Sequence, residues 1–317
     1  MTAYDTVLLA GDRRGAKSVF GKNKAFLEVK GIPSFIRVIT ALQKVKAVNE
    51  IRVVGSADEI RTLLEKHADA WSGPKTVKVL PQKDNIIENV WTAFIDSLPD
   101  YQEGKEAPAE QKEKAVLVVA GDVPLLIPDE INEFISNCDT SRFDYYVGVV
   151  SDKTLSFFAP KKGRVGGVRL AFLPMKEINC RINNLHLLKP FKISNKYRIE
   201  DMYEHRYQRK LRNVLIFFLK IVRLEGIKSA ALFYIAIQAT LFFRRIGMIN
   251  ISKMISSSLT IARFESIVGR ILGTKISIAE TTCGGAVLDI DSEADFKVIN
   301  ERFEEWMECQ KGRYPLE

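Results

Sequence analysis

The sequence predicts an α/β fold in which a mostly parallel central sheet is flanked by helices and carries a helical insertion. Short apolar runs alternate with segments of helical spacing through the first 150 residues, as strands and crossover helices do in a parallel sheet. One run, "AVLVVAGDVPLL" from residue 115, is almost continuously apolar, which is typical of a strand buried on both faces. Between residues 203 and 273 the sequence has helical spacing and mixes basic with apolar residues, which indicates a helical insertion.

The expected elements follow in chain order. Strands are predicted at 4–10, 50–56, 76–82, 115–120 and 144–150. Helices are predicted at 32–48, 57–71, 85–98 and 128–138, with another after the acidic residues near 290. The Glu-, Lys- and Pro-rich stretch 99–114 lacks apolar periodicity and is expected to be a mobile surface loop. We therefore expect a catalytic domain made of 1–190 and 274–317, interrupted by a helical insertion at 191–273.

Composition limits the partners and the compartment. The 317 residues carry a formal net charge of +8, which favours anionic partners: nucleotides, phosphorylated metabolites, anionic lipid or nucleic acid. Four scattered cysteines without a C-x-x-C pair disfavour a zinc site or a disulfide framework and fit a reducing cytoplasm. The sequence shows no signal peptide, and it shows no nucleic-acid recognition module.

The loop after the first strand, "GDRRGAKSVFGKNKAF" from residue 11, matches neither the Walker A pattern nor the G-x-G-x-x-G dinucleotide pattern. It nevertheless combines glycines with several cations, and backbone amides together with cations suit a polyphosphate. A plain solvated basic loop is the alternative.

Three aspartates complete a candidate site. Asp122 follows the predicted strand at 115–120, and Asp289 with Asp291 lies in "LDIDSEAD". Open α/β sheets bind ligands outside the carboxyl ends of their strands, and Mg²⁺ prefers carboxylate and phosphate oxygens. The simpler alternatives are a turn-capping role for Asp122 and an N-cap role for Asp289 or Asp291.

Together, "LLAGDRRGAKSVFGKNKAFLEVKG", "AGDVPLL" and "DIDSEADF" resemble the nucleotidyltransferases of the molybdenum-cofactor guanylyltransferase type, which have a GT-A-like, Rossmann-like fold. This MobA-like resemblance spans about residues 4–190 and 280–300. It implies that Mg²⁺ is held by Asp122, Asp289 and Asp291. It also implies triphosphate contacts for Gly11, Asp12, Arg13, Arg14 and Lys24. It further implies base and ribose contacts for Glu88 and Asn89, and a place near the acceptor for Asn184.

Two positions depart from the family pattern. Asp12 stands in place of the second glycine of L-A-G-G, and Val19 stands where the family usually has its loop arginine. Arg13 or Arg14 is the candidate replacement for that charge. The alternative to a functional role for Lys24 is that of a solvated lysine before a strand. The alternative to a catalytic role for His186 is that of a packed histidine.

The resemblance implies a Mg²⁺-dependent transfer of NMP from an NTP, with GTP or CTP favoured, to a phosphorylated small-molecule or lipid-linked acceptor, with release of pyrophosphate. The expected catalytic residues are Lys24, Asp122 and Arg13. The rival functions are a GT-A nucleotide-sugar glycosyltransferase and a non-catalytic nucleotide- or membrane-binding domain.

The insertion leaves three alternatives open. Residues 203–273 are expected to form a lid, an interface between copies of the chain, or a surface that lies on anionic membrane and admits a lipid-linked acceptor. Its longest uncharged stretch, Ser229 to Phe243, is shorter than the ~20 residues of a spanning helix. The expected location is therefore cytoplasmic, including the inner face of the membrane.

Overall fold

The computed structural model of the chain describes residues 2–12, 18–98, 100–102, 105–161, 166–196 and 228–312. Its strands are β1 (Tyr4–Leu9), β2 (Glu28–Val29), β3 (Ile32–Pro33), β4 (Val48–Gly55), β5 (Val77–Pro81), β6 (Val116–Ala120), β7 (Tyr145–Ser151), β8 (Leu173–Pro174), β9 (Asn179–Leu188) and β10 (Ile276–Thr281). In this part of the chain β2 and β3 form a small hairpin, and the other strands form one sheet.

The α-helices described are α1 (Ser34–Gln43), α2 (Ala57–Lys66), α3 (Ala68–Trp71), α4 (Ile86–Asp96), α5 (Ala109–Lys112), α6 (Pro128–Ser136), α7 (Asp152–Leu155), α10 (Lys228–Arg245), α11 (Ile249–Ser256), α12 (Ile261–Leu272), α13 (Glu293–Glu301) and α14 (Phe303–Lys311). Short 3₁₀ turns lie at η1 (Lys24–Phe26), η2 (Pro190–Lys192) and η3 (Gly285–Val287).

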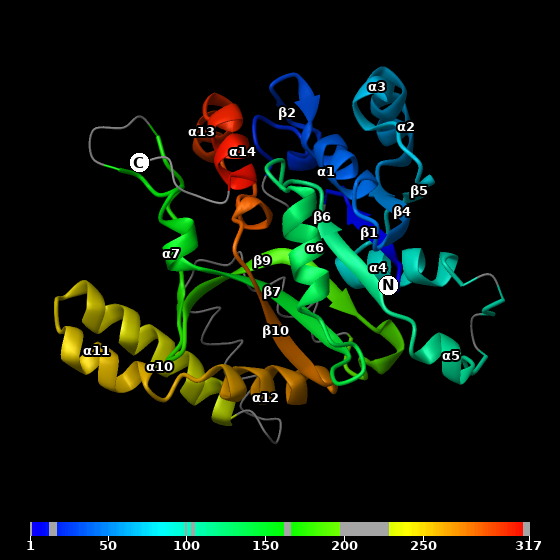
Figure 1. Cartoon of the computed structure of the whole chain (residues 1–317). Coiled ribbons are helices and arrows are strands. Elements are labelled where there is room, and N and C mark those ends of the chain that lie inside the picture. The colour runs from blue at the N-terminus through cyan, green and yellow to red at the C-terminus, as the bar shows by residue number, and fades with distance from the viewer. Residues whose placement is uncertain are drawn as a thin grey trace.

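The main sheet has the strand order β10-β7-β9-β6-β1-β4-β5, with β8 paired to β9 (Figure 1). Strands β6, β1, β4 and β5 are mutually parallel, and β10 is parallel to β7. Strand β9 is antiparallel to both of its long neighbours, β6 and β7. This mostly parallel sheet flanked by helices confirms the predicted fold class.

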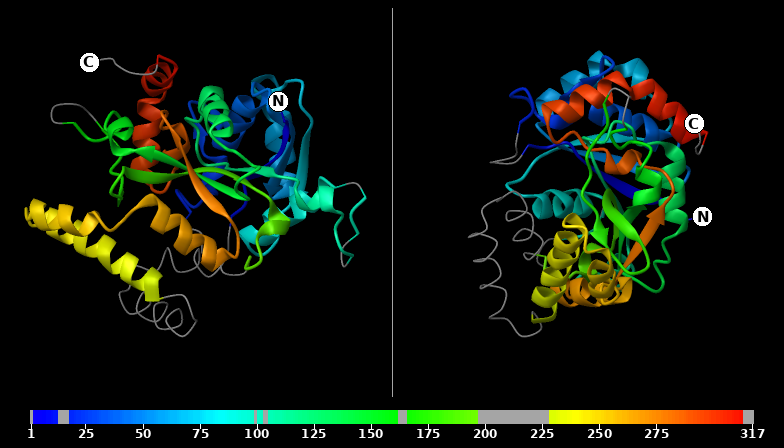
Figure 2. Two further views of the ribbon diagram at one scale, coloured as in Figure 1. Left: turned by 60° about the horizontal axis from the view of Figure 1, so that its bottom comes forward. Right: turned by 90° about the vertical axis from the view of Figure 1, so that its left-hand side faces the viewer.

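Helices cover both faces of the sheet (Figures 1 and 2). One face packs against α1, α2 and α6, in a core that includes Phe35, Ile39, Ile60 and Phe134. The other face packs against α4 and α12, in a core that includes Phe94 and Leu272. Each of these helices has apolar side chains along one face, which packs on the sheet, so that helices bury both faces of the sheet.

The sequence prediction missed two long strands. Strand β9 reads "NCRINNLHLL", and its polar side chains interrupt the apolar run that marks the parallel strands. Strand β10 follows α12 after only a short turn, within the stretch where the helical pattern ends. The predicted surface loop at 99–114 also contains the one-turn helix α5.

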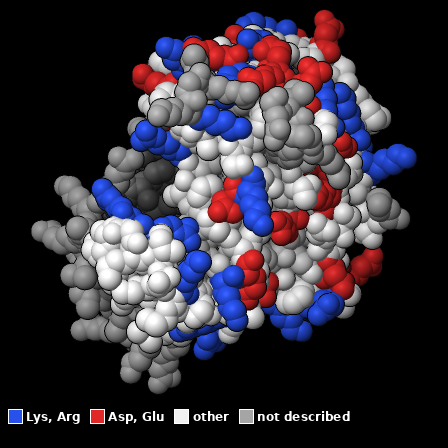
Figure 3. Space-filling model, turned by 60° about the vertical axis from the view of Figure 1, so that its left-hand side comes forward, with Lys and Arg blue, Asp and Glu red and all other residues white. Residues whose placement is uncertain are grey.

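Helices α10 and α11 form a hairpin that extends from one end of the sheet (Figures 1 and 2). The base of the hairpin is anchored because Phe233 and Ile237 of α10 lie in a core with Val149 of β7 and Leu259. On the face drawn in Figure 3, an uncharged area at the lower left, over this hairpin, is bordered by Lys and Arg. No helix in the described ranges combines the length and the apolar composition needed to cross a bilayer.

Candidate active site

The candidate site lies at the point where the strand order changes direction. From β1 the chain moves outward through β4 and β5, then returns to the other side of β1 as β6. The loops that follow β1 and β6 therefore separate at this point and leave room for a ligand at the carboxyl ends of the strands. Leu9 pairs in register with Ala120, so the loops that contain Gly11 and Asp122 begin side by side.

Asn23 positions Lys24 over this edge of the sheet. Its side-chain amide donates to the Ala10 carbonyl at 2.8 Å, and its side-chain oxygen accepts from the Ala25 amide at 3.0 Å. This cap starts η1, whose first residue is Lys24. The Lys24 ammonium forms an ion pair of 2.5 Å with Asp291, which lies 267 residues further along the chain.

Backbone contacts hold the three aspartates near one another. The chain turns sharply after β6, where Gly121 approaches the Leu9 carbonyl too closely for a side chain: an added Cβ would lie 2.9 Å from that oxygen. Asp122 follows this turn, and its own carbonyl accepts from the Ile290 amide at 3.1 Å. That bond brings Asp289 and Asp291, on either side of Ile290, to the end of β6.

The capping alternative for Asp291 is wrong. Ser292 is the N-cap of α13, because its hydroxyl accepts from the Asp295 amide at 3.2 Å. Asp291 instead pairs with Lys24.

The carboxylates repel one another. Burial, and after it the charges of Asp122 and Asp291, raise the pKa of Asp289 to about 7 against a smaller opposing effect of Arg181. The Arg181 guanidinium lies 3.5 Å from the Asp289 carboxylate. Folding therefore brings three carboxyl groups together beside Lys24 and Arg181.

The donor set fits Mg²⁺. Three carboxylates supply the hard oxygen ligands that Mg²⁺ prefers, and a divalent cation would relieve the repulsion that raises the Asp289 pKa. In the described part of the chain, no His, Cys, Asp or Glu side chains are already arranged as a metal centre of three or more ligands. Lys24 supplies the cation on Asp291 in this conformation.

Gln82 closes the first loop from the other side. Its side-chain oxygen accepts from the Asp12 amide at 3.0 Å, and its side-chain nitrogen donates to the Asp12 carboxylate at 2.9 Å. The same side chain lies so close to Gly11 that an added Cβ would be 2.3 Å from its oxygen. The Asp12 amide, which the sequence predicts to contact phosphate, is thus held by Gln82.

The expected base- and ribose-contacting residues begin α4. Glu88 is exposed, and its amide donates to the N-cap oxygen of Asn85 at 2.9 Å. Asn89 is buried, and its side-chain oxygen accepts from the Lys83 amide. Asn89 therefore orders the turn between β5 and α4, while Glu88 faces solvent.

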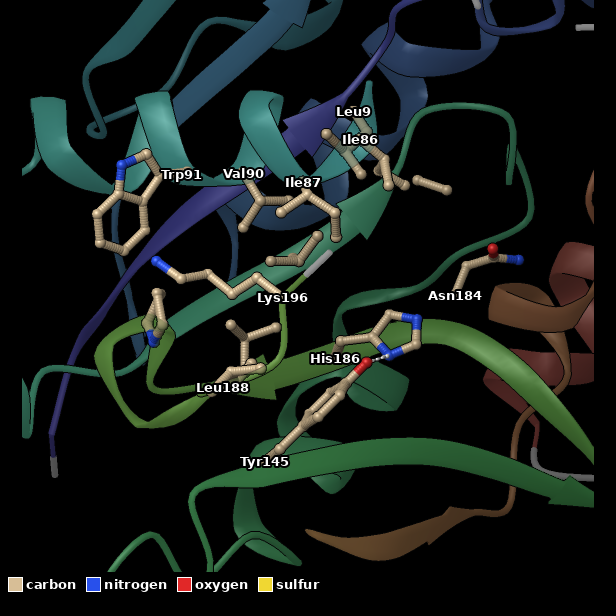
Figure 4. Close-up of a pocket in the computed structure, with 14 residues that line it drawn as sticks. Leu9, Ile86, Ile87, Val90, Trp91, Tyr145, Asn184, His186, Leu188 and Lys196 are labelled. Carbon is tan, nitrogen blue, oxygen red and sulfur yellow. Dashed lines mark hydrogen bonds between the residues drawn. The ribbon is translucent and has the colours of Figure 1, made fainter. Parts of the chain in front are cut away.

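A cavity of about 740 Å³, which includes space open to solvent, lies between α4 and the sheet (Figure 4). Its lining is mainly apolar: Leu9, Ile86, Ile87, Val90, Trp91, Val118, Ala120, Tyr145, Asn184, His186, Leu188, Pro190, Ile193 and Lys196. Two of these residues, Leu9 and Ala120, precede Gly11 and Asp122 by two positions. The cavity therefore adjoins the strand ends that carry the candidate site.

A few polar groups interrupt the apolar lining. The side-chain amide of Asn184, on β9, donates to the Ala286 carbonyl at 2.9 Å and so links the cavity to the segment that leads to Asp289. The Tyr145 hydroxyl and His186 Nδ1 lie 3.1 Å apart (Figure 4). The Lys196 ammonium lies 3.2 Å from the centre of the Trp91 ring, and burial lowers the pKa of Lys196.

A comparison with protein families identifies the family of the chain. A model of the MobA-like NTP transferase domain matches residues 6–216, more than half of the chain. The chain belongs to this family. No curated protein matches the chain by sequence.

A solved structure with a TM-score above 0.5 shares the fold of this member of the MobA-like family. A hypothetical transferase from Thermus thermophilus is 16% identical, with a TM-score of 0.57 over 93% of this chain and 100% of that one. A 4-diphosphocytidyl-2C-methyl-D-erythritol synthase from Anaerococcus prevotii is 12% identical, with a TM-score of 0.48 over 96% of each chain. A CMP:2-keto-3-deoxy-manno-octonic acid synthetase complexed with CTP is 10% identical, with a TM-score of 0.48 over 96% of this chain and 99% of that one.

The departures from the MobA-like pattern can be partly located. Val19, where the family usually has an arginine, is buried among Leu27, Leu125 and Ile290 and so contributes to a core. Arg13 and Arg14, the candidate replacements, lie outside the described residues.

Sequence reasoning missed a buried acid behind the site. The Glu130 carboxyl accepts from the Ala286 amide at 3.0 Å, and burial raises its pKa to about 8. It thereby fixes the segment that leads to Asp289. Glu130 occupies the first turn of α6, where acidic residues are common, so its burial left no signal in the sequence.

Proposed function

We propose that this chain is a Mg²⁺-dependent nucleotidyltransferase that transfers NMP from an NTP to a phosphorylated acceptor. GTP and CTP are the favoured donors. The catalytic domain would comprise 1–190 and 274–317, with 191–273 as a helical insertion. Membership of the NTP transferase family supports the reaction class. The observation that carries the proposal is the meeting of Lys24, Asp122, Asp289 and Asp291 at the switch point of the sheet.

The proposed reaction is an in-line displacement. An acceptor oxygen, from a phosphate or another group, attacks the α-phosphorus of the NTP, and the bond to the pyrophosphate leaving group breaks. A phosphate nucleophile is already ionised at neutral pH, so the site needs no general base. Catalysis then depends on alignment and on neutralisation of charge.

Lys24 and the aspartates have complementary roles in this proposal. Asp122, Asp289 and Asp291 would hold Mg²⁺, which supplies positive charge to the reacting phosphates when it is bound. Lys24 would bind the triphosphate beside Asp291, and the amides after Gly11 would bind it from the first loop, with Arg13 and Arg14 as further cations. Gln82 would have to release the Asp12 amide before that amide could bind phosphate.

The cavity under α4 is the proposed acceptor site. Asn184 lies at its end towards the aspartates, where it would orient the acceptor. The largely apolar lining beside Trp91 and Leu188 favours an acceptor with an apolar portion as well as a phosphate.

Binding of the donor can be tested by thermal unfolding with ATP, CTP, GTP and UTP, each with and without Mg²⁺. A ligand at a hundredfold its Kd stabilises a protein by about 2.7 kcal/mol, which raises the Tm by several degrees. We expect one or two nucleotides to raise the Tm only with Mg²⁺, and Asp122→Asn to abolish that shift. Asp129→Asn, at an exposed aspartate nearby, is the matched control. If no nucleotide shifts the Tm, the proposal is wrong.

Turnover separates the remaining alternatives. Pyrophosphate release from a free NTP in the presence of phosphorylated acceptors is expected of a nucleotidyltransferase. Consumption of nucleotide sugars without any use of free NTP would instead support a GT-A glycosyltransferase. Nucleotide binding without pyrophosphate release for any donor and acceptor would support a non-catalytic domain.

A further inference from the structure

We propose that the tip of the α10–α11 hairpin, residues 242–254, binds the surface of an anionic lipid bilayer. The proposal concerns a surface apart from the strand ends, and it stands or falls independently of the transferase activity.

Among the residues that the structure describes, the exposed large apolar side chains are concentrated on this hairpin. Of the ten large hydrophobic residues exposed in the described part of the chain, eight lie between 232 and 254. They are Leu232, Tyr234, Ile235, Phe242, Ile246, Met248, Ile249 and Met254. Single exposed apolar residues are ordinary, but a contiguous group of them marks an interaction site.

The hairpin tip presents apolar groups because its turn lies beyond the core that anchors α10. Phe233 and Ile237 are buried at the base of the hairpin, whereas Phe242 and Met254 are 57% and 69% exposed. Gly247, at φ +81°, turns the chain between the two helices. The Ser252 hydroxyl donates to the Thr240 carbonyl at 3.0 Å and ties α11 back to α10. The tip is thus an ordered helical hairpin.

The charge on this hairpin has one sign. No Asp or Glu occurs between Lys228 and Phe264, whereas Arg244, Arg245 and Lys253 lie on the hairpin tip. All three cations are exposed, and none forms an ion pair with a described residue. Cations beside exposed apolar side chains match the interface of an anionic bilayer, where lipid phosphates attract the cations and the acyl boundary receives the apolar groups.

A second copy of the chain fits this surface less well. A two-fold dimer would place the same patch of each copy against the other. The cations of one tip would then face those of its partner with no carboxylate from the hairpin between them. Like charges in such an interface are unfavourable, whereas an anionic membrane complements them.

The test is co-sedimentation of the full chain with vesicles of phosphatidylcholine alone or mixed with phosphatidylglycerol. We expect binding to the mixed vesicles, weakened by salt, and little binding to phosphatidylcholine alone. Arg244→Glu with Arg245→Glu should weaken the partition by roughly 30-fold or more, since each basic residue near an anionic surface contributes measurably. Lys44→Glu with Lys46→Glu, at two exposed lysines near the end of α1, changes the net charge equally and is expected to have little effect.

The apolar contribution is tested separately. Phe242→Ser with Ile249→Ser should reduce binding to the mixed vesicles by roughly 100-fold, because both side chains would leave the acyl boundary. Ile182→Ser, at an apolar residue 39% exposed on β9, is the control. Both variants should keep the wild-type circular dichroism spectrum.

Several results would overturn the proposal. Equal binding to both kinds of vesicle, no binding to either, or unchanged binding by the tip variants would each do so. Light scattering that shows a dimer of the wild type, dispersed by Phe242→Ser with Ile249→Ser, would assign the tip to self-association instead. The tip variants should still show the rise in Tm that nucleotide causes with Mg²⁺. If they do, a negative vesicle result overturns only the membrane proposal and leaves the transferase proposal intact.

Discussion

The carboxyl edge of the sheet and the α10–α11 hairpin differ in the kind of side chains that they bring together. At the sheet edge, three aspartates lie near one another, and burial together with the charges of Asp122 and Asp291 raises the pKa of Asp289 to about 7. On the hairpin, large apolar side chains remain in water beside cations. Neither arrangement would be favoured by the stability of an isolated chain, since like charges repel and exposed apolar groups gain nothing from folding.

This difference indicates which kind of partner each region would bind. Excess negative charge on rigid oxygen donors is relieved by a cation with its bound phosphates. Exposed apolar groups among cations are relieved by a surface that is both apolar and anionic. Substitutions should therefore act through charge at the sheet edge and through apolar surface on the hairpin.

The largest effect is expected at Asp122. Asp122→Asn removes a charge from the proposed metal site and should lower kcat/KM for pyrophosphate release by roughly 100- to 1000-fold, as loss of a key electrostatic group does. Because it also removes repulsion, the variant should unfold at no lower Tm than the wild type without nucleotide. An Asp122→Asn enzyme that retains wild-type turnover would show that the sheet edge is not the reactive site.

A smaller loss is expected at Lys24. Lys24→Met removes the cation that pairs with Asp291, and we expect kcat/KM to fall by roughly 10- to 100-fold through weaker stabilisation of the triphosphate. Lys22→Met, at an exposed lysine in the same loop, is the control. Steady-state kinetics of both variants would separate a specific role for Lys24 from a general effect of charge; equal losses would favour the solvated basic loop.

These two predictions rest on residues that the sequence made conspicuous. The parallel strands were predictable because burial on both faces leaves a continuous apolar run, as in "AVLVVA" before Asp122. Lys24 and Asp291 could be nominated from their motifs, but their contact could not, since it depends on how the last segment returns to β6. The backbone bond from Ile290 to Asp122, which sets that return, involves no distinctive side chain.

Other parts of the site were not predictable from the sequence. Strand β9 carries Asn184 and His186 on its cavity side, and these polar residues concealed the strand. Gln82 and Glu130 act through partners far away in the sequence, and Glu130 is also buried. Such long-range hydrogen bonds leave no local periodicity, so only the folded chain reveals them.

A third prediction concerns pH at Asp289. Its pKa in the folded chain, about 7, lies above the ordinary value of 3.8, so folding takes up a proton between these pH values and stability falls as pH rises through them. The amide side chain that Asp289→Asn introduces does not ionise in this pH range. We expect the Tm of this variant to match the wild type near pH 4 and to exceed it by several degrees at pH 8.

Nucleotide sharpens this test. Saturating Mg²⁺ with the nucleotide that binds should raise the Tm of the wild type at pH 8 by more than that of Asp289→Asn, because the cation compensates an ionised carboxylate at position 289 only in the wild type. Thermal unfolding from pH 4 to 8 measures both effects. A difference in Tm that does not change with pH would contradict the proposed repulsion.

The smallest effect is expected on the hairpin, and a matched pair on α10 isolates it. Ile235 and Ile237 lie two residues apart, at 57% and 9% exposure, and only Ile237 belongs to the core that anchors the helix. Ile237→Ala should destabilise the fold by about 2–4 kcal/mol, whereas Ile235→Ala should stay within about 0.5 kcal/mol of the wild type. Urea unfolding of the two variants decides the matter: if Ile235→Ala costs as much as Ile237→Ala, the outer face of the hairpin belongs to the core and is not a free surface. If instead it costs nothing, the apolar surface there contributes little to folding, and its contribution must be sought in binding.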